Sequence, residues 1–195
     1  MSGNQNSTKL IEILNYFDNI MNRETINTAN YLEWNTFRVF ENMESYNVIQ
    51  PNFKMDSYGN PIGNAKSGVE DALIEFENFS ILIECSLRTG ASQLDFEADS
   101  VVRHLKTYLT NNNDKKAFTL FIAPSIDLEF TMMISKNKTT CPVLPLTIEQ
   151  FKKLVSTVSN LDYPNSLHSI IKDLIRLDLD HRSAEEWLTY INLQL

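Results

Sequence analysis

An almost continuous apolar segment at residues 79–87 places the strongest constraint on how this chain can fold. The segment stays apolar until Glu84, as in a central strand that is buried on both faces. A second apolar strand is predicted at 118–123, and a helical pattern occupies residues 92–110 between the two. Strands that alternate with helices in the middle of the chain predict an α/β domain with a mixed central β-sheet.

Extra helices are predicted toward both ends of the chain. They are expected at 10–21, from 25 or 27 to 46, at 128–135, after a cap at Thr147, at 166–177 and at 183–193. Short strands are expected at 48–49, 53–55, 69–77 and around 143, with a turn at 57–63. Residues 1–7 are small and polar, which predicts a flexible end. At 195 residues the chain is long enough to form one domain, 1–195, with an ordinary core.

The charge balance limits what the chain can bind by itself. Asp and Glu number 25 against 17 Lys and Arg, for a formal net charge of −8. Non-specific affinity for DNA comes mostly from Lys and Arg side chains that neutralise phosphates. We therefore expect that another protein must supply much of the hold on any DNA substrate.

The sequence also predicts a compartment. It contains no run of 18 apolar residues, so we expect no transmembrane helix and no membrane partner. No charged-then-apolar signal region opens the chain, and Cys85 and Cys141 lie in or beside apolar segments. These features favour a reduced, cytoplasmic location in a bacterial cell.

Two acidic residues lie in or at the end of the predicted strands. An ionised carboxylate that leaves water costs several kcal/mol unless it is paired or holds a metal. Asp71 and Glu84 are 13 positions apart, and a tight reversal around Asn78 would bring their strands side by side. Two such carboxylates predict a site for one hard divalent cation, and Mg²⁺ is the ion expected there.

Three more polar residues accompany this pair. Glu97 and His104 are seven positions apart on the predicted helix at 92–110, hence on one side of it. Glu33 lies beside Trp34 on an N-terminal helix. Each by itself is more typical of a solvated side chain, or for His104 of a histidine whose hydrogen bonds are satisfied within the fold.

The order of these residues resembles that of a known nuclease core. The chain resembles the PD-(D/E)XK superfamily in the order of three features. These are a helical Glu33, then Asp71 at the close of Gly68-Val69-Glu70-Asp71, then Glu84-Cys85-Ser86 after an apolar strand. More closely, the chain is similar to the cleavage domain of type IIS restriction endonucleases related to FokI, AlwI, MlyI and PleI and of their nicking relatives. The resemblance covers residues 25–125, and the series of five polar residues is its most specific part.

The resemblance implies a restriction-endonuclease-like fold and a set of site residues. The implied catalytic residues are Asp71, Glu84, Glu97, His104 and Glu33. The implied metal ligands are Asp71, Glu84, the main-chain carbonyl of Cys85 and, as a further candidate, Glu97. The implied cofactor is Mg²⁺, for which Mn²⁺ is expected to substitute.

The chain departs from the family motif at two positions. Glu70 stands where the motif has Pro, and Ser86 stands where it has Lys. In the common scheme that Lys orients the attacking water and stabilises charge. Arg88, Lys106 and His104 are candidates to replace it.

The small size then bears on function. Type IIS enzymes that resemble this chain carry a separate, basic recognition domain, for which these 195 residues leave no room. The resemblance therefore implies the small catalytic subunit of a heterodimeric type IIS enzyme. Its partner would be a larger nicking-endonuclease subunit that recognises an asymmetric site on double-stranded DNA and cuts one strand, while this chain, inactive alone, cuts the other.

Three alternatives remain open. One is a free-standing PD-(D/E)XK nuclease of DNA repair or of a mobile element, which a modest set of basic residues would serve. These are Lys54, Lys66, Arg88, Arg103, Lys106, Lys115 and Lys116. Another is an interaction protein in which the acids are structural. A cysteine hydrolase built on Cys85 and His104 is the least favoured, because Cys85 should face away from Glu84 toward the core.

Overall fold

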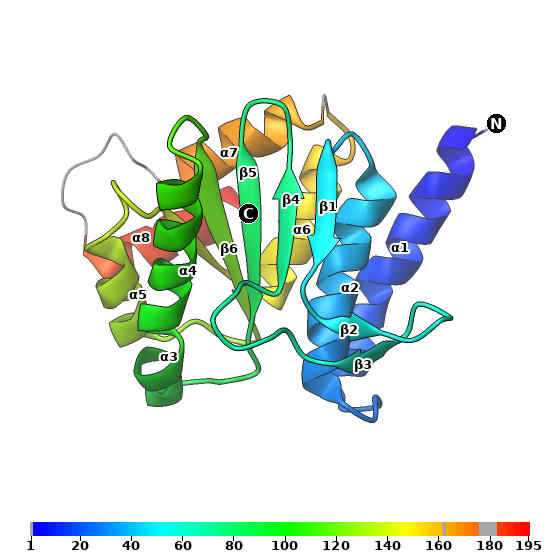
Figure 1. Cartoon of the computed structure of the whole chain (residues 1–195), viewed down its shortest axis with the longest axis horizontal. Helices are drawn as coiled ribbons and strands as arrows, with labels where there is room; N and C mark the ends of the chain where they lie inside the picture. Colours follow the sequence, from blue (N-terminus) through cyan, green and yellow to red (C-terminus); the bar gives the residue numbers. More distant parts are fainter. Residues whose placement is uncertain (1, 162, 176–182) are drawn as a thin grey trace.

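A computed structural model of the chain, which describes residues 2–161, 163–175 and 183–195, has a five-stranded mixed sheet at its centre (Figure 1). Its strands, in sheet order, are β1 (Val48–Pro51), β4 (Ala72–Glu75), β5 (Ser80–Cys85), β6 (Ala117–Ala123) and β7 (Val143–Thr147). Pairing is antiparallel from β1 to β5 and parallel from β5 to β7. The predicted α/β class with a mixed central sheet is confirmed.

The two apolar segments of the sequence are the middle strands of this sheet. Every residue of β6 is buried, as is every residue of β5 except Cys85, which is half-buried. Strands in this position lose water from both faces, so they need apolar side chains in succession rather than in alternation.

Helices cover both faces of the sheet, with α4 in front of it and α6 behind it in Figure 1. The eight described helices are α1 (Ser2–Met21), α2 (Thr28–Met43), α3 (Ala91–Phe96), α4 (Ala98–Asn111), α5 (Leu128–Ser135), α6 (Ile148–Val158), α7 (Asn165–Ile175) and α8 (Ala184–Gln194). The predicted helices at both ends are confirmed, and α5 has the predicted bounds. Within the described ranges, none of them is long and apolar enough to cross a membrane.

A small hairpin, β2 (Lys54–Met55) with β3 (Pro61–Gly63), forms at the predicted turn. Asp56 accepts hydrogen bonds from the backbone amides of Tyr58 and Asn60, and Gly59 adopts a φ of +83°, which favours glycine. The indole Nε1 of Trp34 donates to the Gly59 carbonyl at 2.8 Å. The hairpin is therefore attached to α2.

Several boundaries differ from the prediction. Residues 2–7, predicted as a flexible end, belong to the first turns of α1, and Met1 lies outside the described residues. Helix α2 ends at Met43 rather than near 46, because Glu44 and Ser45 take positive φ values. The helix predicted at 166–177 begins at Asn165, and its last two predicted residues lie outside the described part.

The single helix predicted at 92–110 is wrong: two helices, α3 and α4, meet at Glu97. Neither Gly nor Pro stands at this break, so the local sequence does not signal it. The Glu97 carbonyl accepts hydrogen bonds from both the Ser100 hydroxyl and the Val101 amide at 2.9 Å, and Glu97 caps the end of α3 and the start of α4. The break has a consequence for the site described below, because Glu97 is one of its residues.

The predicted cap of α6 offers a direct test of local stability. Thr147 accepts a hydrogen bond from the Gln150 amide, and Gln150 accepts one from the Thr147 amide, which together form a capping box. Thr147→Ala is expected to lower the free energy of unfolding by about 1 kcal/mol in urea titrations. Ser156→Ala on the exposed face of the same helix is the control, with an expected change below about 0.5 kcal/mol. Equal losses in the two variants would contradict the capping role.

Candidate active site

Asp71 and Glu84 come together at one end of the β4–β5 hairpin. The chain reverses at residues 77–78, where the Phe76 amide donates to the Phe79 carbonyl at 2.8 Å. The register pairs Ala72 with Ile83, and just beyond it the Asp71 amide donates to the Ile83 carbonyl at 2.9 Å. Asp71 therefore lies close to Glu84, whose charge raises the pKa of Asp71. The predicted reversal around Asn78 is confirmed.

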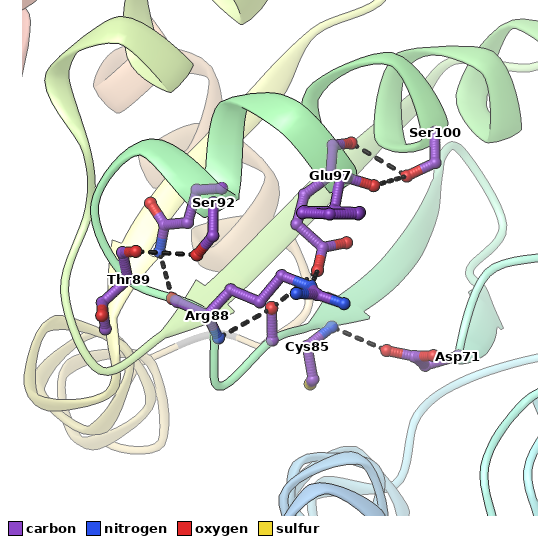
Figure 2. Close-up of polar contacts among 10 residues, drawn as sticks. Asp71, Cys85, Arg88, Thr89, Ser92, Glu97 and Ser100 are labelled. Carbon is purple, nitrogen blue, oxygen red and sulfur yellow. Dashed lines mark hydrogen bonds and ion pairs between the residues drawn. The ribbon is translucent and has the colours of Figure 1, made fainter.

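Asp71 is buried in a region of negative charge. Its Oδ2 accepts a hydrogen bond from the Cys85 amide at 2.7 Å (Figure 2). Burial raises the pKa of Asp71 well above its usual value, and the nearby carboxylates of Glu33 and Glu84 raise it further. The protein therefore holds like charges close together at this position.

Glu84 is bonded to His104 of α4. Nδ1 of His104 lies 2.6 Å from Oε1 of Glu84, so the two groups share a proton. Burial raises the pKa of Glu84 and lowers the pKa of His104, which disfavours charge on both. The other ring nitrogen, Nε2, is buried and has no hydrogen-bond partner among the described residues.

Glu33 approaches the site from α2. One of its carboxylate oxygens accepts from Asn64 Nδ2 at 2.7 Å and the other from the Ala65 amide at 3.3 Å. Its side chain is buried, and this burial raises its pKa. Glu33 thereby holds the loop between β3 and β4 beside Asp71.

Glu97 is held by two residues that follow β5. Its Oε1 accepts from the Ser86 hydroxyl at 2.9 Å and lies 3.1 Å from Nε of Arg88 (Figure 2). The Ser86 oxygen in turn accepts from the Arg88 amide at 3.1 Å. The break between α3 and α4 thus presents Glu97 to the segment that carries Ser86, the residue in the motif-Lys position.

Sequence reasoning missed Gln93, which is fully buried on α3. Its Nε2 donates to the carbonyls of Arg88 and Ser125 at 2.7 and 2.6 Å, and its Oε1 accepts from the Asp127 amide at 2.8 Å. A single Gln in a helical pattern carries no signal of such a role.

The structure argues against the cysteine hydrolase. Glu84 reaches α4, whereas the Cys85 thiol lies 3.5 Å from the Thr36 hydroxyl on α2, so the two side chains face opposite ways as predicted. Burial raises the pKa of the Cys85 thiol well above its usual value. A buried thiol that stays protonated is a poor nucleophile. The sequence predicts surface positions for both His168 and His181. His168 is instead half-buried and stacks on Phe79 with ring centroids 4.5 Å apart, and His181 lies outside the described residues.

The donor atoms at the site fit a hard cation bound by two carboxylates. The described hydrogen bonds occupy Oδ2 of Asp71 and Oε1 of Glu84, which leaves one oxygen of each. Across residues 2–161, 163–175 and 183–195, no three His, Cys, Asp or Glu side chains gather closely enough to hold a metal ion together. Glu97, bonded to Ser86 and Arg88, is therefore not grouped with the pair. Mg²⁺ usually takes only one or two protein carboxylates and keeps several waters, so the pair suffices.

Comparison with known proteins gives concordant results. A model of the AlwI restriction endonuclease family matches residues 4–154. Among solved structures, the chain is similar to the small subunit (R.BspD6I2) of the heterodimeric restriction endonuclease R.BspD6I, with 51% sequence identity and a TM-score of 0.88. This match covers 94% of the present chain and 98% of that one. No match was found among curated proteins. Because the family match spans most of the sequence and the fold agrees, the chain belongs to the AlwI restriction endonuclease family.

Proposed function

We propose that this chain is the small, catalytic subunit of a heterodimeric type IIS restriction endonuclease of the bacterial cytoplasm. It hydrolyses one DNA strand near an asymmetric site that a larger, nicking-endonuclease subunit recognises, and the two subunits together make a double-strand break. The observation that carries the proposal is the buried pair of Asp71 and Glu84 on adjacent strands. The similarity to the R.BspD6I small subunit over nearly the whole chain supports the subunit role.

The charge of the chain supports a division of labour between the subunits. With a net charge of −8, this chain as a whole carries charge of the same sign as the DNA backbone. A larger partner that binds the site would supply the affinity. This chain would then bring only its acidic centre to the second strand.

Asp71, Glu84 and the main-chain carbonyl of Cys85 would hold Mg²⁺, or Mn²⁺ in its place, with Glu97 as a further candidate. The bound ion supplies polarisation of the scissile phosphate and a lowered pKa of the attacking water. The Cys85 amide orients Asp71, and His104 orients Glu84 through its Nδ1. Glu33 holds the loop at Asn64 and Ala65 beside the pair.

Plasmid cleavage with and without the large subunit tests the proposal. We expect the gene for the large subunit to lie beside the gene for this chain, together with a DNA methyltransferase gene. On supercoiled plasmid with Mg²⁺, the isolated chain is expected to cut little, and the large subunit alone to nick. Their mixture is expected to give linear DNA. Site-specific cleavage by the isolated chain would contradict the subunit role and favour a free-standing nuclease, and a mixture that only nicks would contradict the catalytic role.

A further inference from the structure

We propose that Arg88 supplies the positive charge at the scissile phosphate that the Lys of the family motif would otherwise contribute. This inference rests on the proposed nuclease function and assigns a further catalytic residue to it. The guanidinium would donate hydrogen bonds to non-bridging phosphate oxygens and stabilise the charge that builds up as water attacks phosphorus. No bond to Arg88 forms or breaks, and no proton leaves it.

Ser86 cannot fill this role itself. Its hydroxyl carries no charge, and both of its hydrogen-bonding functions are in use: it donates to Glu97 and accepts from the Arg88 amide. The side chain is also buried. Ser86, which occupies the position of the motif Lys, therefore holds Glu97 and Arg88 in place.

Arg88 is held at four points although its side chain is 48% exposed. Its amide donates to Ser86, its carbonyl accepts from Gln93, its Nε lies 3.1 Å from Glu97, and its Cζ lies 4.2 Å above the Phe96 ring. An exposed arginine usually pays a large entropy cost when it binds an anion. Here the two side-chain contacts, to Glu97 and Phe96, meet part of that cost before substrate arrives, which favours effective electrostatic stabilisation.

The donors that a phosphate needs remain on the outer part of this guanidinium. Nε is engaged by Glu97, whereas no hydrogen bond among the described residues uses either Nη group. Arginine carries four N–H donors on these two nitrogens, in a planar arrangement that matches phosphate oxygens. Arg88 follows Glu84 by four positions, and Figure 2 shows its side chain reaching Glu97, whose charge raises the pKa of both Asp71 and Glu84.

The other candidate cations are less suited. Lys106 is exposed and lines a groove with Val102, Leu109 and Cys141, away from the carboxylates. His104 has its Nδ1 engaged by Glu84, and burial lowers its pKa. Arg103 is exposed on α4 and close enough to Glu84 to influence its pKa, but no described contact holds its guanidinium in place.

Single-turnover cleavage by the mixture of large and small subunits tests this assignment. Arg88→Gln is expected to slow cleavage of this chain's strand by about 100-fold, the effect of removing one transition-state donor. Arg88→Lys keeps a positive charge and is expected to recover about tenfold of that loss. Mn²⁺ binding to the isolated variants, measured by calorimetry, and their melting temperatures should match those of the wild-type chain.

The controls separate Arg88 from its rivals. Lys106→Gln is expected to stay within about twofold of the wild-type rate, since it removes a cation that makes no transition-state contact. Three results would each overturn the assignment. Arg88→Gln could cleave at a near wild-type rate, or Arg88→Lys could cleave no faster than Arg88→Gln. The large loss of rate could also appear in Arg103→Gln instead. Loss of Mn²⁺ binding in Arg88→Gln would also overturn it, because the effect would then run through the metal. A wild-type mixture that fails to cut the second strand would contradict the proposed function instead.

Discussion

Asp71→Asn is expected to abolish cleavage of the strand assigned to this chain, with a rate loss of about 1000-fold or more, because the variant removes a charged ligand from the proposed cation site. The amide oxygen of Asn can still accept the hydrogen bond from the Cys85 amide, so the fold should remain intact. In the mixture with the large subunit, supercoiled plasmid should therefore accumulate as nicked circles. Glu77→Gln, an exposed substitution at the other end of the same hairpin, should leave linear product unchanged.

The same substitution is expected to stabilise the protein when no divalent cation is present. Asp71 is buried close to Glu33 and Glu84, and its raised pKa reflects the cost of holding that charge there. A neutral side chain removes the cost, so urea unfolding in EDTA should show a gain on the order of 1 kcal/mol. A metal-free Asp71→Asn variant that is less stable than the wild-type chain would contradict this account of the site.

Gln93→Leu is expected to produce the largest loss of stability, about 3 kcal/mol or more in urea titrations. The substitution leaves the carbonyls of Arg88 and Ser125 and the amide of Asp127 without their partner at partly buried positions beside the fully buried Gln93. Each buried group left unpaired costs about 1–3 kcal/mol. Gln93→Glu keeps the acceptor for Asp127 but loses both donors, so it too should be strongly destabilised.

Ser92→Ala is the matched control for Gln93, since it removes one exposed hydrogen bond to the Thr89 carbonyl from the same turn of α3. Its expected cost is below about 1 kcal/mol. A drop in the free energy of unfolding that is no larger for Gln93→Leu than for Ser92→Ala would show that the hydrogen bonds of Gln93 do not hold the segment at Arg88. The guanidinium of Arg88 would then have to be held in another way.

Much of the site follows from local pattern. Asp71 and Glu84 lie in one hairpin, so their pairing depends only on where the turn falls and on the period of two along a strand. His104 and Glu97 were predicted to share one side of a single helix. His104 does meet Glu84, but Glu97 marks a helix break and bonds to Ser86 and Arg88. At Glu97, the bonds to Ser86 and Arg88 set the direction of the side chain, and the periodicity of one continuous helix does not.

By itself, the sequence determined the order of helices and strands, the buried central strands and the closeness of Asp71 to Glu84. These features depend on hydrophobic periodicity and on short loops, which act between neighbours along the chain. Only the tertiary structure decided that Gln93 bonds to Arg88, Ser125 and Asp127, and that Glu33 bonds to Asn64. Apart from the Gln93–Arg88 bond, which spans five positions, these contacts join segments 31 to 34 positions apart, and they depend on which helix faces pack together and at what angle. Hydrogen bonds require positions accurate to a few tenths of an ångström, which a pattern of apolar and polar residues does not encode.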